Sequence, residues 1–452
     1  MSRTMKDSGI EWIGDVPEEW EVHPFKAYYK TTKGLNITKE NLVERGIPVI
    51  SYGQIHSKLN TGTSICDALI RYVPETYLES NPECLSKKYD IFFADTSEDV
   101  EGAGNIAFVD TDTPIFAGYH TIIARPQKEV KTKYFAYLAK TDAWRTQIRN
   151  SLSGVKVFSI SQKLINRVYI ILPPLAEQHL IATFLDKKCS EIDSLIDLQE
   201  QMIEELKAYK QSVITEAVTK GIRNEEFGIR NEELGIRNYK DSGIEWIGDV
   251  PEEWEVCKVS RLFYVQLGKM LQPNRENETY ELCNYLCAAN VGKNVLKLEP
   301  LKQMWISERE KEQYSVKKGD LLVVEGGDVA SCDIINEDVS DLYIQNALHR
   351  VRSKGEQDVR VLRYLLIVAK CRGYIDLICN KATISHFTKE KFESMPYIVS
   401  PTPKEQQAIA DYLDKKCGEI DELITIKQQK IESLKEYKKS VIYEYVTGKK
   451  EP

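Results

Sequence analysis

The feature that most constrains this chain is a long segment that occurs twice, at a constant offset of 228 residues. The residues Leu-Asp-Lys-Lys-Cys at 185–189 return at 413–417, and matches continue on both sides. Neither copy contains an internal proline, and only the second contains a glycine, Gly418. Because each copy has about 45 residues and an average helix about 11–12, the repeat predicts two exceptionally long helices.

Apolar residues recur along both copies at alternating steps of three and four, which is typical of helices that pair along their length. At about 1.5 Å per residue, each helix would be about 65–70 Å long. The alternative is an ordinary amphipathic helix in each copy, broken near its middle. The expected seam follows the frame Ile192, Leu195, Met202, Leu206, Tyr209 and Val213, with Ile420, Leu423, Leu434, Tyr437 and Val441 in the second copy. A flanking row, one position further on, consists of Ile196, Ile203, Ile424 and Ile431.

A second repeat is a box of seventeen residues, Lys6–Val22, which returns without a change at Lys240–Val256. Identity over that length shows that the gene contains a duplication. We expect the apolar residues Trp12, Ile13 and Trp20 to pack, with the long helices as a candidate surface. A ligand-binding role for the tryptophans is the alternative.

The segments between the repeats are mixed in character and have diverged from each other. Segment 23–172 predicts strands at 47–52, 90–94, 105–109, 120–124 and 168–172, and a helix over 133–149. Segment 257–400 follows the same plan, in which 318–324 is expected to correspond to 88–93 and His349 to His120. The sequence therefore predicts an α+β protein with two similar mixed α/β domains, two long antiparallel helices between them and an internal pseudo-two-fold repeat.

Charge is distributed unevenly over a chain whose net charge is −8. Segment 23–172 has a balance of +4 and segment 257–402 one of +2, so the acidic excess lies on the repeated helices and boxes. No apolar run is long enough to span a membrane, and the first residues lack the apolar core of a signal peptide. The ten cysteines show no repeating pair, and only Cys283 and Cys287 have a spacing that a zinc site could use. We expect free thiols in a reducing cytoplasm.

We find no catalytic motif. Phosphate-binding glycine loops of either common type are missing, and so is the Asn/Asp-Pro-Pro-aromatic motif of amino-methyltransferases. Two similar modules on a long helical spacer instead suit a two-part target. Half-sites on one face of DNA lie about 34–36 Å apart, or a multiple of that distance.

These motifs together resemble the specificity subunits of type I restriction–modification systems. The resemblance rests on the Trp-Ile-Gly-Asp-Val-Pro-Glu-Glu-Trp box and on the Pro-Pro-Leu-x-Glu-Gln-x-x-Ile-Ala opening at 173–182. The second opening departs from it, with Pro-Thr-Pro at 401–403. The resulting division is 1–22 first box, 23–172 first target-recognition domain, 173–220 first spacer helix, 221–239 linker, 240–256 second box, 257–400 second target-recognition domain and 401–449 second spacer helix.

The resemblance implies a non-catalytic subunit that reads a bipartite, asymmetric site in double-stranded DNA. It implies docking of two modification subunits, which bind S-adenosylmethionine and methylate adenine, and of restriction subunits that use ATP and Mg. No cofactor is expected on this chain. The flanking row with Ile196 and Ile203 is then expected to face the modification subunits. The alternative is a non-enzymatic coiled-coil scaffold that binds proteins only.

Between the two halves lies a tandem repeat, with Gly-Ile-Arg-Asn starting at Gly221, Gly228 and Gly235. A seven-residue unit keeps helical phase, but a glycine in each unit costs about 0.8–1 kcal/mol relative to alanine. Both a linker with partial helicity and a helical extension remain open. A helical unit would add about 10 Å, roughly three base pairs, to the spacing of the half-sites.

Candidate DNA contacts are polar residues on loops beside the core strands, where they can reach base edges. In the first domain they are Tyr52, Gln54, His56, Lys58, Ser97, Asn105, Tyr119, His120 and Lys156. In the second they are Asn290, Lys293, Asn294, Asp328, Gln345, Asn346, His349, Arg350 and Ser385. The lysines among them are expected to contact phosphates, which position the protein without reading sequence.

Overall fold

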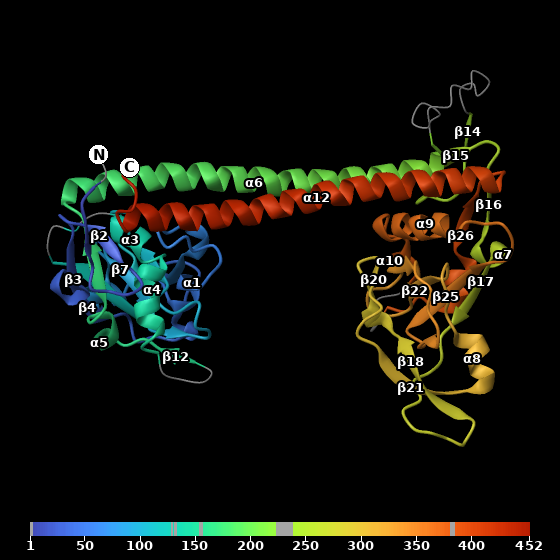
Figure 1. The fold of residues 1–452 in the computed structure, drawn as a ribbon, viewed down its shortest axis with the longest axis horizontal. Coiled ribbons are helices and arrows are strands. Elements are labelled where there is room, and N and C mark those ends of the chain that lie inside the picture. Colours follow the sequence, from blue (N-terminus) through green and yellow to red (C-terminus); the bar gives the residue numbers. More distant parts are fainter. Residues whose placement is uncertain (1–2, 128–129, 131–132, 153–156, 223–237, 380–384) are drawn as a thin grey trace. The chain divides into compact units, whose positions relative to one another are not determined.

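A computed structural model describes residues 3–127, 130, 133–152, 157–222, 238–379 and 385–452. The chain divides into two compact units, residues 1–200 with 428–452, and residues 201–427. Two long helices, α6 (Leu175–Lys220) and α12 (Pro403–Val446), each contribute one part to each unit (Figure 1). The expected fold class is therefore confirmed, and both helices are unbroken, Gly418 included. The tandem repeats from 223 to 237 and Lys156 lie outside the described residues.

The domain of the first unit is built on two sheets. One has the order β4 (Tyr29–Lys33), β11 (Thr121–Pro126), β7 (Ile91–Ala94) and β9 (Ile106–Phe108). The other has the order β10 (Phe116–Ala117), β5 (Ile47–Ile50) and β6 (Arg71–Val73). Around them lie β1 (Met5–Asp7), β2 (Asp15–Pro17), β3 (Glu21–Pro24), β8 (Thr96–Ser97), β12 (Phe158–Ser159), β13 (Tyr169–Leu172), α1 (Tyr52–Ile55), α2 (Tyr77–Ser80), α3 (Tyr134–Leu138), α4 (Asp142–Arg149) and α5 (Gln162–Ile165).

The helix expected over 133–149 is two helices, α3 and α4. The hydroxyl of Thr141 donates to the carbonyl of Leu138 at 2.7 Å, which ends the first helix by occupying one of its last acceptors. Thr141 then has extended backbone and opens the second helix.

The domain of the second unit has the same topology. Its sheets have the orders β17 (Phe263–Leu267), β25 (Leu348–Ser353), β22 (Leu321–Val324), β23 (Cys332–Ile334), and β24 (Leu342–Ile344), β18 (Tyr280–Leu286), β21 (Lys302–Ser307). The other elements are β14 (Tyr239–Asp241), β15 (Asp249–Pro251), β16 (Glu255–Lys258), β19 (Val291–Gly292), β20 (Val295–Leu296), β26 (Pro396–Val399), α7 (Val259–Leu262), α8 (Glu308–Tyr314), α9 (Val359–Cys371), α10 (Tyr374–Ile378) and α11 (Lys389–Ser394).

Strand register corrects one expected match between the domains. With β7 aligned on β22, Ile122 pairs with Phe93 as His349 pairs with Val323. His349 therefore corresponds to Ile122, and His120 corresponds to Ala347. The sequence match failed by two residues because it aligned the two histidines. The true register is marked by Arg125 and Arg352, which bind the equivalent acids Asp90 and Asp320.

The repeated boxes pack as expected. Trp20 is fully buried in the first core, and its indole N–H donates to Glu177 of α6 at 3.0 Å. Its repeat, Trp254, is 2% exposed in the second core. Burial of both tryptophans gives the boxes a structural role.

The two long helices run antiparallel within each unit. In the first unit, Lys438 of α12 binds Asp193 of α6 at 2.6 Å, and the rings of Phe184 and Tyr445 pack with centroids 4.3 Å apart. In the second unit, Lys210 binds Asp421 at 2.6 Å. The two ion pairs are related by the offset of 228, so the contacts repeat as the sequence does.

The expected seam is correct at Ile192, Val213, Ile420 and Val441, which are buried, and wrong along the rest of its frame. Residues Ile196 and Ile203, expected on a flanking row, are buried, whereas Leu195 and Leu423 are each 47% exposed. The buried side of α6 is formed by Leu185, Cys189, Ile192, Ile196, Gln199, Ile203, Val213 and Ala217. The physical reason lies towards the ends of the helix. Extended in both directions, the expected frame would bury the charged residues Lys188 and Glu216, which resist burial. The observed frame places Cys189 and Ala217 there instead.

Adjacent residues of α6 test this frame. Ile196→Glu should lower the free energy of unfolding by about 2–4 kcal/mol, because it buries a charge in the seam. Leu195→Glu, the matched control on the exposed side, should stay within about 0.5 kcal/mol of the parent. Urea denaturation, monitored by the circular dichroism signal of the helices, measures the free energy of unfolding of both variants. Equal losses in the two variants would contradict the assignment.

Candidate nucleic-acid interface

Five expected residues of the first domain come together near the carboxyl end of β7. Tyr52 opens α1, and its ring centroid lies 5.6 Å from that of Tyr119 and 5.4 Å from that of His120. His120, at a positive φ of 54°, turns the chain into β11. The result is an aromatic and polar cluster on loops that the strands hold, with Tyr52 and Tyr119 half-buried and His120 exposed.

A hydrogen-bonded chain extends this cluster. The Nε2 of His56 lies 2.8 Å from the carbonyl of Thr96, and its Nδ1 lies 3.2 Å from the amide nitrogen of Asn105. Arg145 in turn donates to the amide oxygen of Asn105 at 2.7 Å. Desolvation lowers the pKa of the Arg145 guanidinium, in keeping with its inner position.

The second domain has its own polar cluster, around Asp328. Its carboxylate accepts from the backbone N–H of Lys293 at 3.0 Å, from Ser331 at 2.5 Å and from the ammonium of Lys370 at 2.5 Å. Desolvation opposes the charge, but these donors outweigh it and lower the pKa of Asp328 to about 2. A carboxylate with so many internal donors holds the loop together and has little capacity left to accept from a base.

Four expected contacts are buried instead. They are Ser97 (1% exposed), Asn290 (5%), His349 (0%) and Arg350 (9%). His349 contacts the carbonyl of Phe387 through Nε2 at 2.7 Å, and burial lowers its pKa. Ser97 and Asn290 bond to nearby backbone carbonyls, and Arg350 to that of Ser315. In this structure these four side chains support the loops from within.

The remaining expected residues stay at the surface. Lys58 is exposed, and Ser385, Gln345, Asn346, Asn294 and Gln54 are half-buried. Gln54 accepts from the N–H of Ser51 at 3.1 Å, and Gln345 donates to Asn346 at 2.6 Å. Asn294 accepts from the N–H of Cys332 at 3.1 Å.

Sequence reasoning missed the residues Asp95, Glu325 and His386. Asp95 lies 3.1 Å from His120, and Glu325 lies 3.0 Å from His386. Partners 25 and 61 residues apart leave no local pattern. The sequence did offer one signal for the two acids, because each directly follows a predicted buried strand.

Each unit also presents apolar residues of the long helices to solvent. In the first unit these are Leu195 (47% exposed), Leu198 (49%) and Tyr437 (55%). In the second they are their repeats Leu423 (47%), Ile426 (51%) and Tyr209 (54%). We call these the first and second helix surfaces. Their equal exposure shows that both copies keep the same apolar face.

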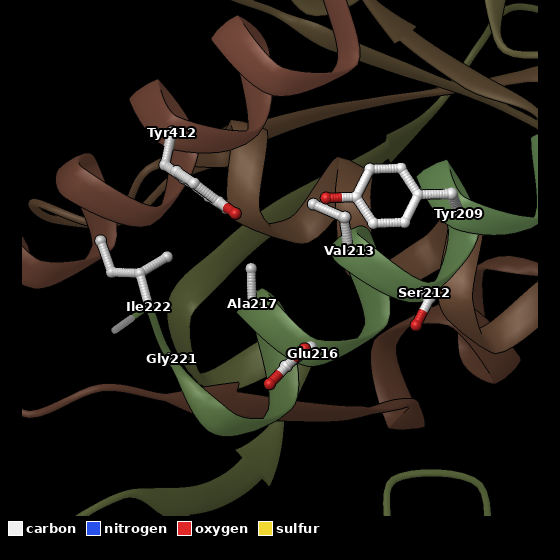
Figure 2. A pocket seen from close by; sticks show the side chains of 8 residues that line it. All are labelled: Tyr209, Ser212, Val213, Glu216, Ala217, Gly221, Ile222 and Tyr412. Carbon is white, nitrogen blue, oxygen red and sulfur yellow. The ribbon is translucent and has the colours of Figure 1, made fainter. Parts of the chain in front are cut away.

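A pocket of about 190 Å³ adjoins the second helix surface (Figure 2). Its lining includes Tyr209, Ala217 and Tyr412, as the figure shows. The repeats of Ala217 and Tyr412 in the first unit are Tyr445 and Phe184, whose rings pack together. Replacement of a tyrosine by alanine between the copies therefore accounts for the space.

Among the described residues, no three His, Cys, Asp or Glu side chains gather as a metal site would require. No helix in that part of the chain is long and apolar enough to cross a membrane.

The domain pattern and the paired helices define a class of protein. The family model for the type I restriction modification DNA specificity domain matches residues 17–208 and again 251–448. The chain therefore belongs to this family, with the domain present twice, and its role is DNA sequence specificity.

Particular relatives agree over nearly the whole length. The putative type I restriction enzyme MjaX specificity subunit of Methanocaldococcus jannaschii is 26% identical, covering 97% of this chain and 95% of its own. The MjaVIII specificity subunit of the same organism is 24% identical, covering 96% and 93%. A chain from a solved type I R-M complex aligns with a TM-score of 0.69 at 16% identity, covering 96% and 99%. The HsdS subunit of Thermoanaerobacter tengcongensis gives 0.55 at 16% identity, covering 96% and 98%.

The pKa of Asp328 has a consequence for acid stability. A carboxyl whose pKa is depressed on folding stabilises the fold above its ordinary value of 3.8, and that contribution disappears as the pH falls toward about 2. Asp328→Asn should therefore flatten the loss of stability between about pH 4 and pH 2. The urea midpoint of both proteins across that range measures the effect. Parallel curves would contradict it.

Proposed function

We propose that this chain reads a bipartite, asymmetric DNA site, one half with each recognition domain, and directs adenine methylation, restriction or both by partner subunits. The recognition domains are assigned to 23–172 and 257–400. The observation that carries the proposal is that the same domain occurs twice with one topology and different loop residues. Two readers of one fold and different surface suit two different half-sites.

Binding of two modification subunits is part of the proposal. The first and second helix surfaces present apolar residues at equivalent positions with nearly the same exposure, 47% for both Leu195 and Leu423. Exposed apolar patches that a duplication preserves mark contact surfaces. Two equal surfaces favour two copies of one partner, and they replace the flanking row with Ile196 and Ile203 as the docking residues.

The chemistry is assigned to those partners. S-adenosylmethionine, ATP and Mg act in the modification and restriction subunits, and this chain contributes recognition without catalysis. We place the complex in the cytoplasm, in contact with the host chromosome. The comparisons lend no support to the alternative of a scaffold that binds proteins only.

Dependence of methylation on this chain tests the proposal directly. A host that expresses the modification subunit should gain a bipartite methyl-adenine motif only when this chain is also expressed. Sequencing of methylated adenines with and without the chain measures it. A motif that persists without the chain, or no motif with it, would refute the function.

The helix surfaces predict stepwise assembly. Leu195→Asp with Leu198→Asp should remove one modification subunit, because charge disrupts the apolar contact. The equivalent changes at Leu423 and Ile426 should remove the other, and all four together should remove both. Native mass spectrometry of the complex counts the subunits. Lys207→Asp, on an exposed face of α6 away from these residues, is the control and should leave both bound.

A further inference from the structure

Each recognition domain holds one histidine with the carboxylate that directly follows a central strand. In the first domain Asp95 follows β7, and its Oδ1 lies 3.1 Å from Nδ1 of His120. In the second Glu325 follows β22, and both of its oxygens lie 3.0 Å from Nδ1 of His386. The histidine side chains are 58% and 50% exposed. Both pairs therefore face solvent while their acids are anchored to the sheet.

The two carboxylates occupy the same backbone position. Each donates its N–H to the residue before the neighbouring strand and accepts at its C=O from a later segment. The bonds are Asp95 N to His120 O at 3.1 Å, Ile160 N to Asp95 O at 2.7 Å, Glu325 N to Ala347 O at 2.9 Å and Phe387 N to Glu325 O at 2.8 Å. The acids are thus equivalent in the two domains.

The histidines are not equivalent, and this difference is informative. The first domain takes its histidine from the residue before β11, where the second has Ala347. The second takes it from the residue before Phe387, where the first has Ser159. A duplication alone would have kept one source. Each domain instead forms its carboxylate–histidine pair with a histidine from a different segment of the chain.

The chemistry of such a pair is defined. A carboxylate that accepts from Nδ1–H fixes the tautomer of the neutral ring, so that Nε2 carries a lone pair. Neither His120 nor His386 has a hydrogen-bond partner for Nε2 among the described residues. Each ring therefore offers an oriented acceptor to solvent.

We infer that Nε2 of His120 and Nε2 of His386 each accept a hydrogen bond from the exocyclic amino group of an adenine or cytosine, one in each half-site. This inference rests on the proposed function. The amino groups at N6 of adenine and N4 of cytosine are the donors that the major groove presents. Asp95 and Glu325 are positioning residues that fix the ring.

Nearby lysines support a nucleic-acid contact. In each domain, the segment that donates to the carbonyl of the acid leads into a short helix with lysine. Lys163 lies in α5, after Ile160, and Lys389 and Lys391 lie in α11, after Phe387. The ammonium of Lys391 lies 3.1 Å from the carbonyl of His386. Lysines beside a base-reading group neutralise phosphate and fix register.

The test uses the complex assembled with its modification subunits and a DNA library in which each base pair of the site is varied. His386→Ala should reduce discrimination at one position of one half-site, roughly five- to tenfold, the low end for a base-edge contact. His120→Ala should do the same in the other half-site. Methylation rates across the library measure both.

Two sets of controls separate reading from folding. His23→Ala removes an exposed histidine that also contacts a carboxylate, Glu21 at 2.9 Å, and should leave the pattern unchanged. Glu325→Ala should weaken discrimination at the position that His386 reads. Glu325→Gln should restore part of it, because its amide oxygen still accepts from Nδ1–H.

A uniform fall in methylation over all bases would assign the histidines to phosphate and overturn the inference. An unchanged pattern in both histidine variants would overturn it as well. A wild-type complex without any chain-dependent methylation would refute the proposed function itself, and the inference with it.

Discussion

Both domain cores depend on the pairing of the two long helices. The first core contains Leu185 from α6 and Val446 from α12, and the second contains Ala217 from α6 and Leu413 from α12. The beginning of one long helix and the end of the other thus complete each core. Neither helix could be removed without exposing apolar surface in both units, which would cost about 25 cal/mol for each Å². Each domain core is therefore complete only with residues from both long helices.

Polar contacts between the long helices determine the register of the pairing more than its stability. The Asp193 carboxylate that Lys438 binds is 48% exposed, and ion pairs at such sites contribute about 0–1 kcal/mol. Their value is orientation, since charged partners at defined positions favour one register. Tyr137 donates to Asp186 at 2.5 Å, and Tyr364 to Asp414 at 2.7 Å, so each domain is tied to its long helix by the same bond.

Elements that the duplication preserved could be predicted from the sequence, because identity marks them. The long helices, the buried boxes and five strands of the first domain follow from repeats and apolar runs. The frame of the seam did not, because Leu195 and Ile196 both offer an apolar side chain at adjacent positions. The charges at Lys188 and Glu216, towards the two ends of the helix, separate the frames. The apolar spacing near Leu195 fits either frame, whereas the residues towards the ends of the helix fit only one.

The candidate site divides in the same way. Residue type and loop position brought together Tyr52, His56 and His120, but they could not distinguish an exposed histidine from the buried His349. That distinction depends on strand register, which places His349 opposite Val323 inside the sheet. The acids at 95 and 325 act on histidines far away in sequence, so only the folded backbone brings them together. In a protein with two copies of one recognition domain, the scaffold repeats but the proposed DNA-contacting side chains differ. The repeats in the sequence therefore mark the scaffold and leave the recognition residues unmarked.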